Sequence, residues 1–368
     1  MTRISINQPM IGRDEKIAVM RVLGRKVLTS ATEPGGTEVR SFEKALKTYL
    51  GCKHVIAVNS GTSALYASLL VLGIGPGDEV AVPSFSFVAT ANAVLLTGAK
   101  PVFVDISENS YSMSPDDLAK KISPDTAAII PVHLYGYPAD MRSIRSVAIK
   151  NGLPIIEDAA QSLGARYEGK HTGTLGDLGC FSFHASKVIM SGEGGAIATD
   201  RNDLFDRLRR IRTHGIGRDG DPSTFGTNLR MGEIEAAILT VQLNRLTSFL
   251  DKRKRNAKEM SRLLSQKGGV VLPSSLKGAS SNWYLYTVSL DKGRDKVLAK
   301  LNRMEVDARV YYRIPIHNSS LYQQLGYRGE SLTMTERASK RVLSLPIHPG
   351  MTLGQIRRIA RLLVTEVQ

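Results

Sequence analysis

Lys187 is the residue of this chain whose surroundings point most directly to covalent chemistry. It follows the short β-type run Phe181–Phe183 and precedes the glycine cluster Gly192–Gly195. Lysine is the only side chain with a primary amine that forms a Schiff base with a carbonyl, and partial desolvation supplies the neutral amine near pH 7. Most lysines are solvated surface charges, so Lys187 becomes informative only together with other residues.

A carboxylate upstream of Lys187 strengthens that interpretation. The apolar run Leu153–Ile156 predicts a buried strand that leads into Asp158, which places this residue at the carboxyl edge of an α/β sheet, where ligands bind. A Schiff-base lysine and a carboxylate that keeps a pyridine nitrogen protonated are what pyridoxal phosphate (PLP) requires. The alternative role for Asp158 is a helix N-cap, with Gln161 completing a capping box.

The third element is a candidate anion site. His54–Val58 is a β-type run, Gly61 can adopt unusual backbone angles, and a helical pattern begins at Ser63. Free N–H groups and hydroxyls at a helix N-terminus suit a phosphate, although ordinary helix capping explains the same residues. The segment is neither a Walker A loop nor G-x-G-x-x-G, so it gives no support to a P-loop enzyme or a Rossmann dehydrogenase.

Together with further motifs, these segments resemble the DegT/DnrJ/EryC1/StrS family of PLP-dependent sugar aminotransferases, which have the aspartate aminotransferase-type fold (fold type I). The similarity runs nearly from end to end, and so many motifs in order are unlikely to arise by chance. The matching segments are Ser60–Thr62, Pro83–Ala93, Pro131–Gly136, Glu157–Gln161, Gly176–Asp177, Ser182–Lys187, Gly192–Gly195, Asn228–Met231 and Leu343–Pro349.

The resemblance implies a role for each matching site residue. Lys187 and Asp158 would be catalytic, with Lys187 forming the Schiff base and Asp158 pairing with the ring nitrogen. Asn228 would contact the phosphate across the interface of a homodimer, so that two subunits share the active site. Phe87 would stack on the pyridine ring, although it could equally be a core aromatic. The remaining cofactor-binding residues would be Thr62, Ser63 and Ser182 at the phosphate and Gln161 at the ring hydroxyl.

Retention of Lys187 favours transamination, because relatives that remove a hydroxyl group carry histidine at this position. The resemblance implies transfer of an amino group from an amino acid, with L-glutamate expected, to a nucleotide-linked keto sugar. The product would be an amino sugar for a surface polysaccharide or a secondary metabolite. Two alternatives stay open: a keto-cyclitol aminotransferase, and a non-catalytic PLP-binding sensor or binding module on the same fold.

Composition narrows the remaining choices. With 368 residues and 42% hydrophobic content, the chain can bury a large core. Cys52 and Cys180 are far apart and form no C-x-x-C pattern, so neither a disulfide framework nor a metal site is expected. Met1–Ser5 has no signal-peptide character and no apolar run approaches a bilayer span, so we expect a cytoplasmic protein without a membrane partner.

The net charge of +15 invites comparison with nucleic-acid-binding proteins. The basic runs Arg207–Arg212 and Asp251–Arg255 lie in helical patterns, lack interleaved aromatic residues and match no nucleic-acid motif. Solvated helix faces are the simpler interpretation, and no nucleic-acid partner is expected. A positive field that attracts a nucleoside-diphosphate substrate is the alternative that fits the resemblance.

The alternation of strands and helices predicts an α/β protein with a mostly parallel central sheet in a large PLP-binding domain, residues 1–247, and a smaller C-terminal α+β domain, residues 248–368. Helices are expected over Asp14–Leu23, Glu38–Leu50, Met231–Leu246 with a continuation from Asp251, Lys296–Arg303, Thr335–Leu343 and Leu353–Val364. Strands are expected over His54–Val58, Glu79–Val82, Pro101–Val104, Ala127–Val132, Leu153–Ile156, Cys180–Phe183, Gly195–Ala198 and Asn282–Leu290.

Overall fold

A mostly parallel sheet forms the centre of the computed structural model, which describes residues 3–32, 34–108, 110–217, 219–265 and 268–367. β2 pairs in parallel with β3 and β4, and β5 pairs in parallel with β8. β9 is antiparallel to its neighbours β8 and β1, and isolated bridges join the β4 segment to the β5 segment. The strands are β1 (His54–Val58), β2 (Glu79–Pro83), β3 (Lys100–Val104), β4 (Thr126–Ile129), β5 (Ile156–Asp158), β8 (Leu178–Ser182) and β9 (Gly195–Thr199).

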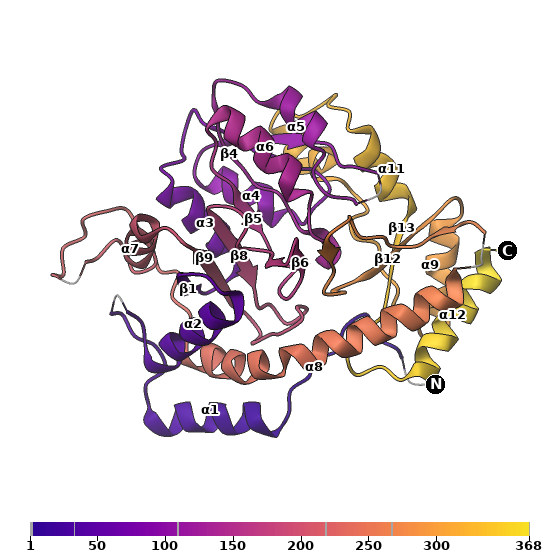
Figure 1. Cartoon of the computed structure of the whole chain (residues 1–368), viewed down its shortest axis with the longest axis horizontal. Coiled ribbons are helices and arrows are strands. Elements are labelled where there is room, and N and C mark those ends of the chain that lie inside the picture. Colours follow the sequence, from indigo (N-terminus) through magenta and orange to yellow (C-terminus); the bar gives the residue numbers. More distant parts are fainter. Residues whose placement is uncertain (1–2, 33, 109, 218, 266–267, 368) are drawn as a thin grey trace.

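Helices cover this sheet, and their ends follow local sequence signals (Figure 1). The Ser60 hydroxyl caps α3, and α2 and α6 end at Gly51 and Gly152, which adopt the left-handed conformation that glycine tolerates. The helices along this part of the chain are α1 (Arg13–Arg25), α2 (Thr37–Leu50), α3 (Gly61–Val71), α4 (Ala89–Leu96), α5 (Pro115–Lys121), α6 (Met141–Asn151) and α7 (Asn202–Ile211).

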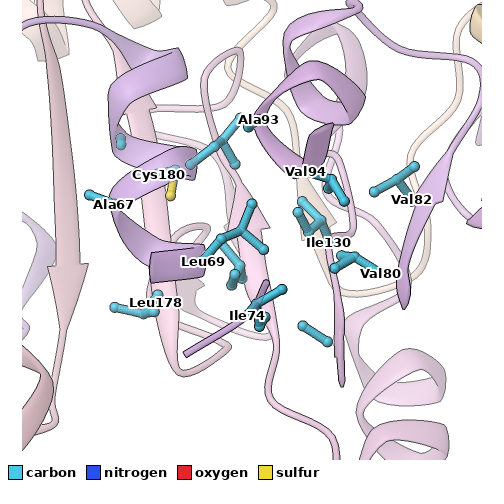
Figure 2. Close-up of a cluster of buried hydrophobic side chains, with 14 of the residues drawn as sticks. Ala67, Leu69, Ile74, Val80, Val82, Ala93, Val94, Ile130, Leu178 and Cys180 are labelled. Atoms are coloured by element: carbon cyan, nitrogen blue, oxygen red, sulfur yellow. The ribbon is translucent and has the colours of Figure 1, made fainter. Parts of the chain in front are cut away.

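The largest hydrophobic cluster fixes α3 and α4 against the sheet (Figure 2). Ala67 and Leu69 of α3 belong to one buried cluster with Leu178 and Cys180 of β8. This packing fixes the two segments that carry the predicted site, because α3 begins at the candidate anion site and β8 leads to Lys187. The fold class and the strand order along the chain are confirmed, with β5 beginning at Ile156 rather than at Leu153.

One long helix, α8 (Glu233–Leu264), runs through the expected helical stretch Met231–Leu246 and its continuation from Asp251. Its first half packs against α1 and α2, and its second half packs against the C-terminal helix α12 (Leu353–Val367) (Figure 1). Because α8 is continuous, the expected boundary at residues 247/248 falls inside a helix. The division of the chain into two domains at that point stays a prediction.

The C-terminal part of the chain builds a smaller layer around a three-stranded antiparallel sheet of β10 (Val270–Val271), β12 (Tyr286–Leu290) and β13 (Val342–Leu345). The expected helix Thr335–Leu343 was wrong at its end, because α11 (Thr333–Arg341) stops and Val342 begins β13. Pairing with β12 and complete burial of β13 override the helical pattern there. The remaining strands and helices are β6 (Arg166–Tyr167), β7 (Lys170–His171), β11 (Ala279–Ser280), α9 (Arg294–Arg303), α10 (Ser320–Gln324) and the 3-10 helices η1 (Leu134–Gly136) and η2 (Ile316–Asn318).

Both expected basic runs turn out to have inward-facing members. Arg212 is almost fully buried and forms an ion pair with Glu43, and Arg253 is almost fully buried in α8. These runs are therefore not purely solvated faces. Within the described residues, no helix combines the length and the apolar character needed to cross a bilayer.

A buried carboxylate fixes the loop beside the end of β5. Glu157 is fully buried, and it accepts hydrogen bonds from the backbone N–H groups of Gly173, Leu175 and Gly176 and contacts His133 Nε2 at 2.8 Å. Its charge is thus surrounded by donors, as a buried anion requires.

We expect Glu157→Gln to lower the free energy of unfolding by about 3 kcal/mol. The amide NH₂ group of glutamine would face backbone N–H groups that now donate to the carboxylate, and these N–H groups would lose their acceptor. Denaturant unfolding of the cofactor-free protein measures this. The control, Glu168→Gln, changes an exposed ion pair with Arg142 and should cost less than about 1 kcal/mol. Equal stability of the Glu157 variant and wild type would contradict the assigned network.

Candidate active site

Lys187 lies in the turns that follow β8, near the carboxyl edge of the central sheet. Its backbone N–H donates to the His184 carbonyl at 2.9 Å, and its Nζ lies 5.0 Å from the centroid of the Tyr284 ring. The side chain is half-buried. The amine is therefore held against an aromatic face from the C-terminal part of the chain and is not a freely solvated charge.

Asp158 is the last residue of β5 and is buried. It accepts hydrogen bonds from the Thr90 hydroxyl at 2.8 Å and from the Ala160 N–H at 3.1 Å. Burial raises the pKa of the Asp158 carboxyl above its usual range, while these two hydrogen bonds and the nearby charge of Lys187 act in the opposite direction. In the described segment 159–201, turns and strands follow Asp158 and no α-helix begins there, so the helix-capping alternative was wrong.

Gln161 bridges two aromatic segments beside Asp158. Its Oε1 accepts the backbone N–H of Tyr135 at 2.9 Å, and its Nε2 donates to the Tyr312 hydroxyl at 3.3 Å. Both side-chain ends are thus occupied by the protein. Tyr135 has a positive φ of 59° and is fixed further by its hydroxyl, which donates to the Tyr311 carbonyl.

The candidate anion site forms where three segments meet. A Cβ added to Gly61 would lie 2.8 Å from Cβ of Ser182, and one added to Gly195 would lie 2.2 Å from the Ser60 carbonyl. Only glycine permits these approaches, so the glycines bring the start of α3, the end of β8 and the start of β9 together. The Thr62 hydroxyl makes no hydrogen bond to any residue that the structure describes.

Ser63 differs from Thr62, because its hydroxyl is already engaged. It donates to Asn59 Oδ1 at 2.6 Å and lies 2.9 Å from the Ser60 hydroxyl. The geometry therefore leaves Thr62 and Ser182 with more freedom than Ser63 to bind a phosphate. The phosphate role of all three residues stays a prediction.

Phe87 is 56% exposed, which is not the burial of a core aromatic. Its ring centroid lies 6.3 Å from that of Tyr312, which in turn contacts Gln161. Phe85, two residues earlier, is the buried aromatic of this segment. An exposed ring next to the site is available for stacking, and the stacking itself stays a prediction.

Asn228 lies beside the anion site of its own chain. Its backbone carbonyl accepts from Asn59 Nδ2 at 3.3 Å, and Val58 and Arg230 form an antiparallel bridge. The residue is exposed, although its side-chain oxygen already accepts the backbone N–H of Arg230 at 3.4 Å. A contact across a subunit interface stays a prediction.

Two residues of this site were missed by the sequence analysis as site residues: Thr90 and Tyr284. Thr90 lies in the resembling segment Pro83–Ala93, so motif context could have suggested it. Tyr284 gave no such signal, because its contact with Lys187 depends on the packing of distant segments.

The arrangement suits one kind of cofactor. PLP presents an aldehyde, a pyridine nitrogen and a phosphate, and the site offers a chemical partner for each: a lysine amine, a buried carboxylate and a helix N-terminus. The close contacts at Gly61 and Gly195 hold the start of α3, the end of β8 and the start of β9 together at this end of the site. Fold and site together define a PLP-dependent enzyme of fold type I.

Comparison with known proteins gives the family. The chain belongs to the DegT/DnrJ/EryC1/StrS aminotransferase family, whose model matches residues 12–364. It is 38% identical to GDP-perosamine synthase of Caulobacter vibrioides, over 98% of this chain and 97% of that protein. It is also 38% identical to dTDP-3-amino-3,4,6-trideoxy-alpha-D-glucose transaminase of Streptomyces venezuelae, over 91% of this chain and 88% of that protein. A pleiotropic regulatory protein of Geobacillus stearothermophilus is 38% identical over 94% and 95%, respectively.

Solved structures agree with this assignment. The chain matches S. venezuelae DesV in complex with a ketimine intermediate at a TM-score of 0.95 and 35% identity, covering 100% of this chain and 99% of that one. It matches Bacillus subtilis NtdA with bound cofactor PMP at a TM-score of 0.89 and 34% identity, covering 98% and 85%. PLP is the cofactor of the family to which this chain belongs.

We expect Asp158→Asn to separate stability from function. Because burial raises the pKa of folded Asp158, its ionisation opposes folding above that pKa, and the effect fades as pH falls and the carboxyl is protonated in both states. The cofactor-free variant should therefore unfold at higher denaturant than wild type at neutral pH, with a difference that shrinks toward acid pH. Its transamination rate should fall about a hundredfold or more.

Denaturant unfolding at several pH values measures the first effect, and exposed Asp125→Asn is the matched control. An Asp158 variant less stable than wild type at neutral pH would contradict this prediction. It would mean that the hydrogen bonds from Thr90 and Ala160 stabilise the ionised carboxylate by more than its burial destabilises it.

Proposed function

We propose that this protein is a PLP-dependent aminotransferase that transfers an amino group from an amino acid, expected to be L-glutamate, to a nucleotide-linked keto sugar. The observation that carries the proposal is a half-buried Lys187 amine, held against the Tyr284 ring, whose charge acts on the buried Asp158 carboxylate at the same edge of the sheet. The transaminase and synthase names of relatives at 38% identity support the substrate class. The proposal includes an amino-sugar pathway and a cytoplasmic location.

Each site residue has a definable task in this proposal. PLP supplies the electron sink that stabilises negative charge on the carbon next to the reacting nitrogen. Asp158 keeps the ring nitrogen protonated, and its own position is fixed by Thr90 and Ala160. Lys187 Nζ anchors the cofactor and, once released, removes the proton from the α-carbon of the donor. One amine thus serves as both anchor and base.

A regulatory role is the second candidate. It is favoured by the name of one relative, a pleiotropic regulatory protein that matches this chain over nearly its whole length. A binding module needs a cofactor pocket but has no use for a proton-transfer amine. The presence of Lys187 opposite Asp158 therefore supports catalysis over this alternative.

We expect Lys187→Ala to abolish amination and to remove the visible absorbance that PLP shows when it is bound to a lysine. The assay incubates purified protein with L-glutamate and a panel of nucleotide keto sugars, with keto-cyclitols included, and detects replacement of the carbonyl by an amine by mass spectrometry. Exposed Lys150→Ala is the control and should match wild type. A colourless wild-type protein that binds no PLP would contradict the proposed function. Amination of a keto-cyclitol alone would show that the substrate is a cyclitol and not a nucleotide-linked sugar.

The proposal also includes a homodimer that shares its active sites. α1 turns Glu15, Ala18 and Val22 inward, and its outer face presents exposed apolar side chains, among them Met20 at 66% exposure. Such a face on a soluble enzyme typically marks a contact surface. The exposed pair Val27 and Leu28 extends it, and the Leu28 carbonyl accepts the N–H of Glu233, close in the chain to Asn228.

We expect wild type to be a dimer in solution and Ile17→Lys/Met20→Lys to shift it toward monomer, because buried lysines are costly at an interface. Light scattering coupled to size-exclusion chromatography measures the mass. Ile149→Lys is the matched control, since Ile149 is 75% exposed on α6, away from α1. Dissociation by the control, but not by the double variant, would place the interface elsewhere.

A further inference from the structure

Arg253 is a buried cation for which the proposed reaction gives no reason. It lies in α8, is 2% exposed, and has no carboxylate within ion-pair distance among the residues that the structure describes. Burial lowers the pKa of its guanidinium to about 10. Burying an unpaired charge is costly, so a chain that keeps one there needs the contacts that this charge makes.

Those contacts reach two separate segments. Nη1 of Arg253 donates to the carbonyls of Trp283 and Tyr284, each at 3.1 Å, and Nη2 donates to Asn7 Oδ1 at 3.3 Å. The guanidinium therefore ties the N-terminal segment and the chain just before β12 to the middle of α8. A planar fork with several donors can serve three acceptors at once, which a lysine ammonium on a flexible stem does less well.

Both tethered residues converge on Ser186, the residue before Lys187. Asn7 Nδ2 donates to the Ser186 carbonyl at 2.8 Å, and the Tyr284 hydroxyl donates to Ser186 Oγ at 3.4 Å. The Tyr284 ring also faces Lys187 Nζ. The reactive segment is thus contacted at its backbone by Asn7 and at its amine by Tyr284, the two residues whose oxygens accept hydrogen bonds from Arg253.

We propose that Arg253 is a positioning residue for Lys187, acting through Asn7 on the backbone of Ser186 and through Tyr284 on the lysine amine. The inference rests on the proposed role of Lys187 as the amine that anchors PLP. In this arrangement the guanidinium removes freedom from the turn that carries Lys187, so that its amine meets the cofactor aldehyde in a reactive orientation.

A purely structural role for Arg253 is the competing explanation, because the same hydrogen bonds also fasten α8 to its neighbours. The two explanations differ in what they predict for Asn7. If Arg253 only stabilises the fold, loss of the Asn7 amide should change stability and leave Lys187 unaffected. If it positions Lys187, the Asn7 and Arg253 variants should slow the same step and their effects should not multiply.

The experiment adds PLP to cofactor-free protein and follows the visible absorbance that appears as Lys187 reacts. The variants are Arg253→Met, Arg253→Lys, Asn7→Leu and the double variant Arg253→Met/Asn7→Leu, and exposed Lys254→Met is the neighbouring control. A second readout needs no cofactor: peptide mass spectrometry measures how fast an amine-reactive reagent labels Lys187 relative to Lys150. Denaturant unfolding confirms that each variant is folded.

We expect Asn7→Leu and Arg253→Met each to slow absorbance growth about tenfold, the size expected for losing a charge-assisted hydrogen bond. Arg253→Lys should fall between wild type and Arg253→Met, and the double variant should be no slower than the slower single variant. The relative labelling of Lys187 should change in the same order, and Lys254→Met should match wild type in both readouts.

Wild-type rates in folded Asn7→Leu and Arg253→Lys would overturn the inference, as would single effects that multiply to about a hundredfold in the double variant. Should Arg253→Met fail to fold, Asn7→Leu and Arg253→Lys still decide the question, because each keeps most of the packing around α8. A wild-type protein that does not react with PLP overturns the proposed function instead, and the labelling readout then still tests the positioning of Lys187.

Discussion

The desolvated carboxylate of Asp158 is the constraint on which the rest of the site depends. Successive residues of a strand point to opposite faces of a sheet, so β5 can present two adjacent carboxylates to two different environments. Glu157 meets backbone N–H groups and His133, and these use up its capacity as an acceptor. From the residues that the structure describes, the Asp158 carboxylate accepts two hydrogen bonds, and it stays within the field of Lys187. One carboxylate is therefore structural, and its neighbour keeps the capacity to bind a cationic ring.

Close backbone approach is the second requirement, and glycine supplies it. Gly195 lets the start of β9 pass against the Ser60 carbonyl, and Gly61 lets the start of α3 pass against Ser182. The anion site is thus assembled by main-chain contacts between three segments. This explains why the glycine cluster after Lys187 belongs to the site even though its residues offer no side-chain chemistry.

The sequence predicted the elements that carry strong local signals. β1 was expected at His54–Val58 and is observed there, because a continuous apolar run, buried on both faces, ends at the turn before α3. The helical stretch expected over Met231–Leu246, with its continuation from Asp251, is observed as the single helix α8, whose two halves bury apolar side chains in two different clusters. Val342 was assigned to a helix because its pairing with β12 is set by the tertiary structure, which the local pattern does not record.

Within the site, Lys187 and Asp158 were predictable because each lies in a local pattern with a chemical meaning. Their supports were not, because the contacts join residues far apart in the chain. Thr90 reaches Asp158 across 68 positions, and Asn7 reaches Arg253 across 246. The local sequence gives the type of a residue but does not show whether its side chain is buried or which distant residue it contacts.

Arg253 shows the consequence most clearly. In the sequence it stands in the run Asp251–Arg255, among residues of the same charge, and nothing distinguishes it from Lys252 or Lys254. In the fold its neighbours stay exposed, whereas Arg253 turns into the protein and bonds to carbonyl and amide oxygens. These neutral oxygens solvate the guanidinium without cancelling its charge. The cation can therefore orient the polar groups around Lys187 without bringing a second carboxylate close to the lysine amine. Asp158 remains the carboxylate that interacts electrostatically with that amine.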